Sequence, residues 1–312
     1  MAYEINNPGC AITEGNNTGN PKCVFKPGQY RGLILIPANK VILDADIPDI
    51  ITKLQEMTLA EKSSRAYPIF RFEEIADNSE DLTVTTYGYG GKSIGKEGHY
   101  DWTFKLITGG LMHQNKLRSF NGTTMKVLLV DVNNVIYGTR VATGLAGLTL
   151  DLFYAQPWKA ADGSNEAMFQ LRIGLAKPKE LNENVGIVKV AEDVETSVLG
   201  ILDLELSQLA VVAGKATVGI KTALDKTDIF EVLGDALADG DLWSVKGPTG
   251  AAVSISSVAK SATLSGWDVS FTGTGVHTIT LASPADLAAG DVGGAPDNGY
   301  EANSLAVTMP AP

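Results

Sequence analysis

The glycine-rich run Tyr87–Ser93 ends in Gly-Lys-Ser, the three residues that close a phosphate-binding loop. That loop also needs a glycine five residues before Gly91, where Thr86 stands, and a helix directly after the serine. The following residues Ile94–Gly98 are a poor helix start. We therefore expect a glycine-rich hairpin or an inter-subunit loop, in which the two tyrosines of the run provide contact area.

Side chains for acid–base or nucleophilic chemistry are scattered. His99, His113 and His277 are the only histidines, and none accompanies a nucleophile in a recognisable motif. A carboxylate cluster could serve glycoside hydrolysis, but we interpret it as a solvated acidic loop. It consists of Glu73, Glu74, Asp77, Glu80 and Asp81.

Metal-binding patterns are incomplete. Asp235, Asp239 and Asp241 lack the spacing and the distal glutamate of a calcium loop. Cys10 and Cys23 have no Cys or His pair at zinc spacing, and we expect two free thiols, although a disulfide between them is geometrically possible. We predict no catalytic, cofactor-binding or metal-binding residues, and the chain is not expected to be an enzyme.

The length of the chain and the distribution of its charges indicate two domains. Its 312 residues exceed the usual size of one domain. Residues 1–191 carry 20 basic and 20 acidic side chains, whereas residues 192–312 carry 5 and 16, so the net charge of −11 lies entirely in the C-terminal part. This shift predicts a domain boundary near residue 191. Neither the neutral part nor the acidic part has the net positive charge that favours nucleic-acid binding. A groove lined with acidic residues would still let DNA slide past without binding.

Membrane and secretion signals are not evident. No stretch approaches the roughly 20 apolar residues of a membrane helix, and the first thirty residues lack the regions of a signal peptide. We expect a soluble protein made in the cytoplasm, without a membrane span.

The first part of the chain predicts a β-rich domain with one helix. Residues 1–30 are rich in turn signals and predict an extended arm, either packed on a neighbouring subunit or flexible. Residues 31–43 predict strand, turn and strand. A helix is expected over about 46–64, capped by Asp46 and with Pro48 in its first turn. Period-two alternation predicts strands over residues 100–106, 148–154 and 168–175, and a hairpin turn at 132–134. Residues 31–191 thus read as an antiparallel β-sandwich or barrel.

The acidic part repeats the strand pattern. Alternation predicts strands near 202–206, 267–271, 277–281 and 305–309, with a turn at 273–275 and a short helix near 228–238. Short strands at this spacing favour an immunoglobulin-like β-sandwich over residues 192–312.

The runs Ala66–Phe70 and Glu80–Gly90 resemble structural proteins of tailed-phage virions, most of all tail tube proteins. In that family a β-sandwich with a long hairpin and one helix stacks into hexameric rings, and an immunoglobulin-like domain is often appended at the C-terminus. The likeness lies in architecture over most of the chain, without a diagnostic motif, and carries over no site residues.

The resemblance implies a virion protein that self-assembles into rings stacked as a DNA conduit. The partners would be copies of the chain, other virion proteins, and DNA that passes without specific binding. The neutral domain would assemble through sheet edges and the 1–30 arm, and the acidic domain would lie outside and keep the assembly soluble. The alternatives are a capsid or head decoration protein, and a carbohydrate- or surface-binding module using exposed aromatics such as Trp158 or Trp243.

Overall fold

A computed structural model describes residues 28–81, 83–96, 98–107, 110–164, 166–289 and 299–311. The protein is mainly β, with several antiparallel sheets. It divides into two compact units, the first made of Met1–Met57 and Ser63–Val198, the second of Thr58–Lys62 and Leu199–Pro312. The charge shift near residue 191 therefore precedes the change of unit by a few residues. The greater part of the expected 1–30 arm, including Cys10 and Cys23, lies outside the described residues, and Tyr30 already belongs to the first strand.

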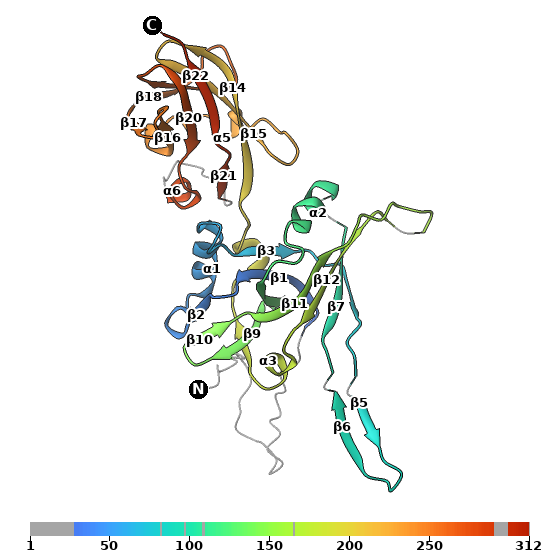
Figure 1. Cartoon of the computed structure of the whole chain (residues 1–312). Helices are drawn as coiled ribbons and strands as arrows, with labels where there is room; N and C mark the ends of the chain where they lie inside the picture. The colour runs from blue at the N-terminus through green and yellow to red at the C-terminus, as the bar shows by residue number, and fades with distance from the viewer. Residues whose placement is uncertain are drawn as a thin grey trace. The chain divides into compact units, whose positions relative to one another are not determined.

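The first unit is built around an eleven-stranded sheet and a separate two-stranded ribbon (Figure 1). The strands of the sheet are β1 (Tyr30–Pro37), β2 (Val41–Leu43), β3 (Tyr67–Phe70), β4 (Glu74–Asp77), β7 (Asp101–Leu106), β8 (Met125–Asp131), β9 (Val135–Val141), β10 (Gly144–Ala146), β11 (Leu148–Ala155), β12 (Phe169–Leu175) and β13 (Val185–Lys189). The ribbon strands are β5 (Thr83–Thr86) and β6 (Lys92–Lys96). The helices are η1 (Asp44–Asp46), α1 (Ile50–Leu59), α2 (Gly110–Arg118), α3 (Pro178–Asn182) and α4 (Val194–Ser197).

The central strand β1 shows why this unit has two cores. It pairs with β3 on one side and β8 on the other, and its alternate side chains enter different apolar clusters. Leu33 and Leu35 face a cluster shared with β7 and β12, whereas Ile34 and Ile36 face a cluster shared with α1. A strand covered on both faces reads as a continuous apolar run, which accounts for the sequence Leu-Ile-Leu-Ile.

Strand β11 joins the two layers around the larger core. Its start pairs with β8, at Leu148 and Thr149, and its remainder pairs with β12. The register shifts between Leu150 and Leu152, a bulge of the kind that bends a strand from one layer into another. The predicted strands near 100–106, 148–154 and 168–175 are confirmed by β7, β11 and β12.

The predicted hairpin turn is also confirmed. Asn134 has φ +57°, in the left-handed region that asparagine tolerates, and it joins β8 to β9. Residues 31–43 form two strands as expected, but these do not pair with each other, since β2 pairs with β10.

The helix predictions for this unit need correction. The helix expected over 46–64 is the shorter α1, preceded by the separate 3-10 turn η1. Its buried face contains the expected Ile50, Ile51 and Leu54. The helix ends early because the chain turns back, so that the Ala66 N–H donates to the Met57 carbonyl at 2.9 Å. The expectation of one helix was also wrong, because α2, α3 and α4 are present.

The second unit consists of two sheets that share one apolar core. Its strands are β14 (Leu202–Val212), β15 (Lys215–Thr222), β16 (Trp243–Lys246), β17 (Ala252–Val253), β18 (Ile255–Lys260), β19 (Trp267–Phe271), β20 (Gly275–Leu281), β21 (Tyr300–Ala302) and β22 (Leu305–Met309). Five strands, in the order β18-β19-β15-β14-β21, form one sheet, and β17-β16-β20-β22 form the other. Among the strands of this unit that the structure describes, the pairs are antiparallel except β14 with β21. The core draws on both sheets and includes the fully buried Trp267.

The remaining elements of the second unit are short. They are α5 (Phe230–Leu233), η2 (Gly240–Leu242) and α6 (Pro284–Ala289). The strands predicted near 202–206, 267–271, 277–281 and 305–309 are confirmed, and α5 falls within the helix predicted near 228–238. Gly273 and Gly275, at φ +131° and +86°, make the predicted turn before β20. Within the described ranges of the chain, no helix has the length and apolarity needed to cross a membrane.

Candidate assembly surface

The ribbon formed by β5 and β6 is the distal part of a long hairpin. Its base continues from the β4–β7 pair through a bridge in which Glu80 and His99 exchange backbone hydrogen bonds of 2.9 and 3.2 Å. Figure 1 shows β5 and β6 extending beyond the ends of β7 and β12. In the described part of the chain, β5 and β6 pair only with each other.

The ribbon exposes apolar side chains. Val84 and Ile94 lie directly opposite each other across the two strands and are 48% and 67% exposed. Thr86 and Lys92 form the next pair on the same face. All four residues of β5 are exposed, so this part of the hairpin contributes little to the cores of its own unit.

The tip of the ribbon carries a tyrosine pair. The rings of Tyr87 and Tyr89 stack with centroids 5.5 Å apart and an interplanar angle of 3°. The Tyr87 and Ser93 hydroxyls share a hydrogen bond of 3.0 Å, while Tyr89 is 82% exposed. A stacked, exposed aromatic pair offers large contact area with few rotatable bonds to order on binding.

The strand geometry of the ribbon shows which structure the Gly-Lys-Ser motif adopts. Lys92 and Ser93 begin strand β6, which runs on to Lys96, so no helix N-terminus faces them. The motif therefore lies in a glycine-rich hairpin, one of the two structures expected for this run, and a strand follows where a phosphate-binding loop needs a helix.

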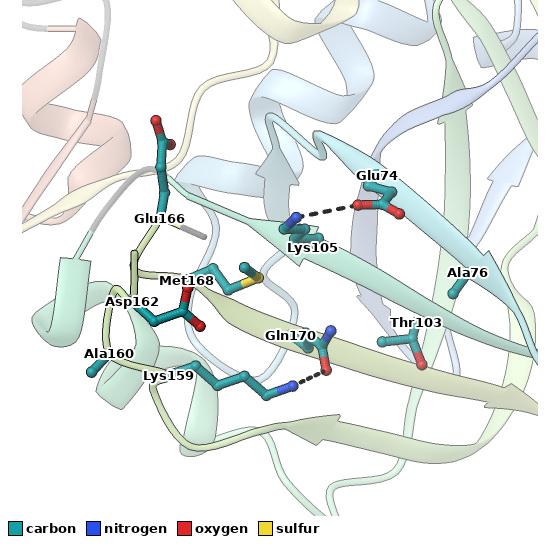
Figure 2. Close-up of a pocket in the computed structure, with 10 residues that line it drawn as sticks. All are labelled: Glu74, Ala76, Thr103, Lys105, Lys159, Ala160, Asp162, Glu166, Met168 and Gln170. Atoms are coloured by element: carbon teal, nitrogen blue, oxygen red, sulfur yellow. Dashed lines mark hydrogen bonds and ion pairs between the residues drawn. The ribbon is translucent and has the colours of Figure 1, made fainter. Parts of the chain in front are cut away.

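A second surface is the outer face of β4, β7 and β12, where a cavity of about 300 Å³ lies among polar side chains. Figure 2 shows Lys105 reaching Glu74 and Lys159 reaching Gln170, while the Glu166 carboxylate points away from the other side chains. The two contacts measure 3.2 and 3.3 Å. Both charge signs are present, and the cations already have partners.

The same outer face continues with one further ion pair and one histidine–carboxylate contact. Arg172 Nε donates to both Asp101 oxygens, at 2.8 and 3.0 Å, and these bonds raise the pKa of the guanidinium. His99 Nε2 lies 2.7 Å from Asp151 Oδ2. The alternation of Asp101, Thr103 and Lys105 placed these residues on the polar face of the strand. Their cross-strand partners depend on register, which the sequence does not display.

The three histidines lie in unrelated environments. His99 is on the outer sheet face, whereas His113 lies on α2 near the Phe169 ring, and burial lowers the pKa of its imidazole. His277 is a buried residue of β20, with Nδ1 3.1 Å from the Gly275 carbonyl oxygen. None of the three contacts another histidine or a serine or cysteine nucleophile in the contacts that the described residues make.

The acidic residues do not form the expected loop throughout. Glu74–Asp77 is strand β4, an edge strand whose backbone pairs with β7, although its carboxylates are solvated as predicted. Asp239 accepts from the Asp241 N–H at 3.0 Å and so caps η2, and Asp235 pairs with Lys260 at 3.4 Å. Within the described ranges, no group of three or more His, Cys, Asp or Glu side chains could hold a metal ion.

The aromatics suggested for carbohydrate binding are not exposed platforms. Trp243 is 5% exposed, and its indole N–H donates to the Leu237 carbonyl at 2.9 Å. Trp158 is partly buried against the apolar cluster shared with β7 and β12, and its ring centroid lies 6.0 Å from that of Phe169. The expectation that Trp243 is an exposed aromatic was therefore wrong, and a carbohydrate-binding module stays an untested alternative.

Comparison with models of protein families finds no match to this chain, and comparison with curated proteins finds none either.

Proposed function

We propose that this chain is a structural protein whose copies assemble into stacked rings, forming the tube of a phage tail. In this proposal the first unit builds the ring wall. The second unit is an immunoglobulin-like sandwich on the outside of the assembly, where its negative charge keeps neighbouring tubes apart. DNA passes through without specific binding, and the protein resides in the virion.

The observation that carries the proposal is the β5–β6 ribbon. A two-stranded ribbon is at best marginally stable in water, because it has no third strand or helix to cover a face. This ribbon nevertheless holds Val84 and Ile94 in solvent, where their burial against another surface would contribute roughly 1–2 kcal/mol each. A partner surface outside the chain supplies the missing cover, and another copy of the same chain is the partner that a repeating tube provides.

Assembly is tested on the purified full chain by light scattering and negative-stain microscopy over a range of concentrations. We expect rings or tubes that grow with concentration. A particle that stays monomeric at the highest concentration would overturn the proposal, as would spherical shells or trimers, which belong to head proteins.

The ribbon's part is tested with the double variant Val84→Asp and Ile94→Asp, which places charges on its apolar face. The variant should remain monomeric while keeping the far-ultraviolet spectrum and thermal midpoint of the wild type. The matched control is Val232→Asp with Val276→Asp, two exposed valines of the second unit. Equal assembly of both double variants would show that the ribbon is not the contact.

A further inference from the structure

His99 contacts Asp151 of β11 although their strands are not neighbours in the sheet. His99 stands two residues before β7, and β12 lies between β7 and β11. Neighbouring strands lie about 4.8 Å apart, which would place these two backbones about 10 Å from each other. His99 Nε2 is nevertheless 2.7 Å from Asp151 Oδ2. The contact therefore spans the full width of β12.

Two features of the sheet allow this reach. Asp151 lies between Leu150 and Leu152, which pair with two consecutive residues of β12, so it is the extra residue of a bulge. A bulge can re-aim the side chain of its extra residue. The β12 residue opposite Leu152 is Gly174, where an added Cβ would lie 2.5 Å from Asp151 Oδ1. The glycine thus leaves free the space that the carboxylate occupies.

The chemistry of the pair fixes which atom donates the hydrogen bond. An ionised carboxylate accepts hydrogen bonds and donates none, so His99 Nε2 carries the hydrogen. This holds for the neutral Nε2–H tautomer and for the imidazolium alike. The His99 and Asp151 side chains are 32% and 42% exposed, so solvent screens the contact and it should add little to the global stability of the unit.

His99 also belongs to the base of the hairpin that carries the ribbon. Its N–H donates to the Glu80 carbonyl at 3.2 Å, and the Glu80 N–H donates to its carbonyl at 2.9 Å. This backbone bridge lies between the β4–β7 pair and the ribbon. Asp151 therefore attaches the hairpin base to β11, a strand beyond the β4 and β12 neighbours of β7.

We propose that the His99–Asp151 contact is a clamp that holds the hairpin base on the sheet and limits the directions that the ribbon takes. Asp151 and Gly174 are positioning residues, which act on the hairpin through His99. The benefit of the clamp rests on the proposed function, because an oriented ribbon loses less conformational freedom when it binds a second copy. The clamp itself is a property of the single chain.

The clamp is tested on the full chain by distance measurement between two spin labels. One label is attached at Thr85→Cys on the ribbon, opposite in face to Val84, and the other at Val132→Cys in the turn after β8. Both native cysteines are replaced by serine. Labelled protein is diluted into an excess of unlabelled wild type, so that only distances within one chain are measured.

We expect a narrow distance distribution with the native clamp and one about twofold broader with Asp151→Ala, which removes the acceptor. His99→Asn should broaden it equally, because the asparagine amide nitrogen stands nearer the backbone, at the position of Nδ1. His99→Gln should keep it narrow, because the glutamine amide nitrogen reaches the position of Nε2 and donates there. Equal widths with the native clamp, Asp151→Ala and His99→Asn would overturn the proposal.

Gly174→Ala supplies an independent variant. Its Cβ should displace the Asp151 carboxylate and broaden the distribution as much as Asp151→Ala does. In the Asp151→Ala background the same substitution should add nothing, because the displaced group is already absent. Additive broadening would contradict the clamp, since Gly174 would then act on the hairpin by another route.

Thermal midpoints and light scattering complete the test. The midpoints should stay within a few degrees of the wild type, because the contact is partly exposed. Light scattering of the unlabelled wild type measures assembly separately. A wild type that never assembles would count against the proposed function, whereas a distribution that is already broad with the native clamp would count against the clamp.

Discussion

The Tyr137 hydroxyl donates to Oδ2 of Asp131 over 2.8 Å, at the turn where β8 becomes β9. Asp131 is fully buried and accepts three further hydrogen bonds. These come from the backbone N–H groups of Gly28, Asn133 and Val135, at 2.9, 2.8 and 3.0 Å. One carboxylate therefore fixes the hairpin turn and the point where the N-terminal segment enters the sheet.

Replacing Asp131 by asparagine should destabilise the first unit by about 2–4 kcal/mol, since an amide group would turn a donor toward donors that the carboxylate now satisfies. Tyr137→Phe leaves the Asp131 carboxylate and its three backbone N–H donors in place and should cost less, about 1–2 kcal/mol. Urea unfolding gives the two values, and hydrogen exchange at Val135 locates the effect. Equal losses for both variants would mean that the carboxylate does not organise the turn.

Alkaline pH should weaken the first unit through Tyr30. Burial, together with Asp131 and Tyr100, raises the pKa of Tyr30 from 10 to about 12. Above pH 10 the unfolded chain loses this proton while the folded chain keeps it, so stability is full below pH 10 and falls as pH rises toward 12. The loss should reach about 2 kcal/mol.

The test for Tyr30 is the denaturation midpoint measured from pH 8 to pH 11.5. Tyr30→Phe should flatten the decline but not abolish it, because burial and Asp131 also raise the pKa of Tyr137. Parallel declines in the wild type and the variant would count against this assignment.

A single methyl group should disturb the ribbon tip. A Cβ atom added at Gly91 would lie 2.4 Å from the Tyr89 ring, so Gly91→Ala should unstack Tyr89 from Tyr87. If the tip contacts a second copy, assembly measured by light scattering should weaken severalfold without a change in thermal midpoint. Gly88→Ala is the matched control, because a Cβ there meets nothing within 4 Å. Assembly that responds alike to both substitutions would place the contact elsewhere.

Arg31 should hold the chain just before it leaves the first unit. Its Nη2 lies 2.8 Å from Asp193 Oδ1 and 2.6 Å from Glu195 Oε2, next to the fully buried Val194. Arg31→Met keeps the apolar stem but removes both pairs, and should cost about 1–2 kcal/mol. A glutamate-specific protease should then cut faster after Glu192 or Glu195. Lys53→Met, which breaks an exposed pair with Glu56, should leave the cutting rate unchanged.

Strands with one buried face were the predictable part of the fold. Trp102, Phe104 and Leu106 alternate with polar residues because β7 has one face on the core and one in solvent. The alternation specifies the face but not the partner, so the pairing of β7 with β4 and β12 could not be foreseen. Strand β4 gave no signal at all, because backbone pairing to β7 holds its polar residues in place.

The presence of α2 and the end of α1 were not predicted, for physical reasons. Among the α2 side chains whose burial the structure describes, the buried ones are Gln114 and Leu117, one polar and one apolar, so the sequence shows no clear apolar stripe. The end of α1 is set by the hydrogen bond from Ala66 to Met57, a contact made only once the chain has turned.

The hairpin of the candidate surface was predictable from the sequence, but the pairing of its strands was not. Glycines at residues 88, 90 and 91 indicated a hairpin. The pairing of Val84 with Ile94 depends on a register shift between Thr83 and Val84, which no residue type marks. Trp243 was expected among the exposed aromatics, but its indole N–H donates to the Leu237 carbonyl inside the core, a contact that the sequence does not display.

The position of β1 between β3 and β8 also limits how early the first unit can fold while the chain is being synthesised. Leu33–Ile36 emerges early, but its partner β8 begins at Met125, about ninety residues later. At ordinary translation speeds this leaves one of the most apolar runs of the protein waiting on the order of ten seconds for its neighbour. During that interval it is a target for chaperones and for other nascent chains, and the first unit cannot close before β8 has left the ribosome.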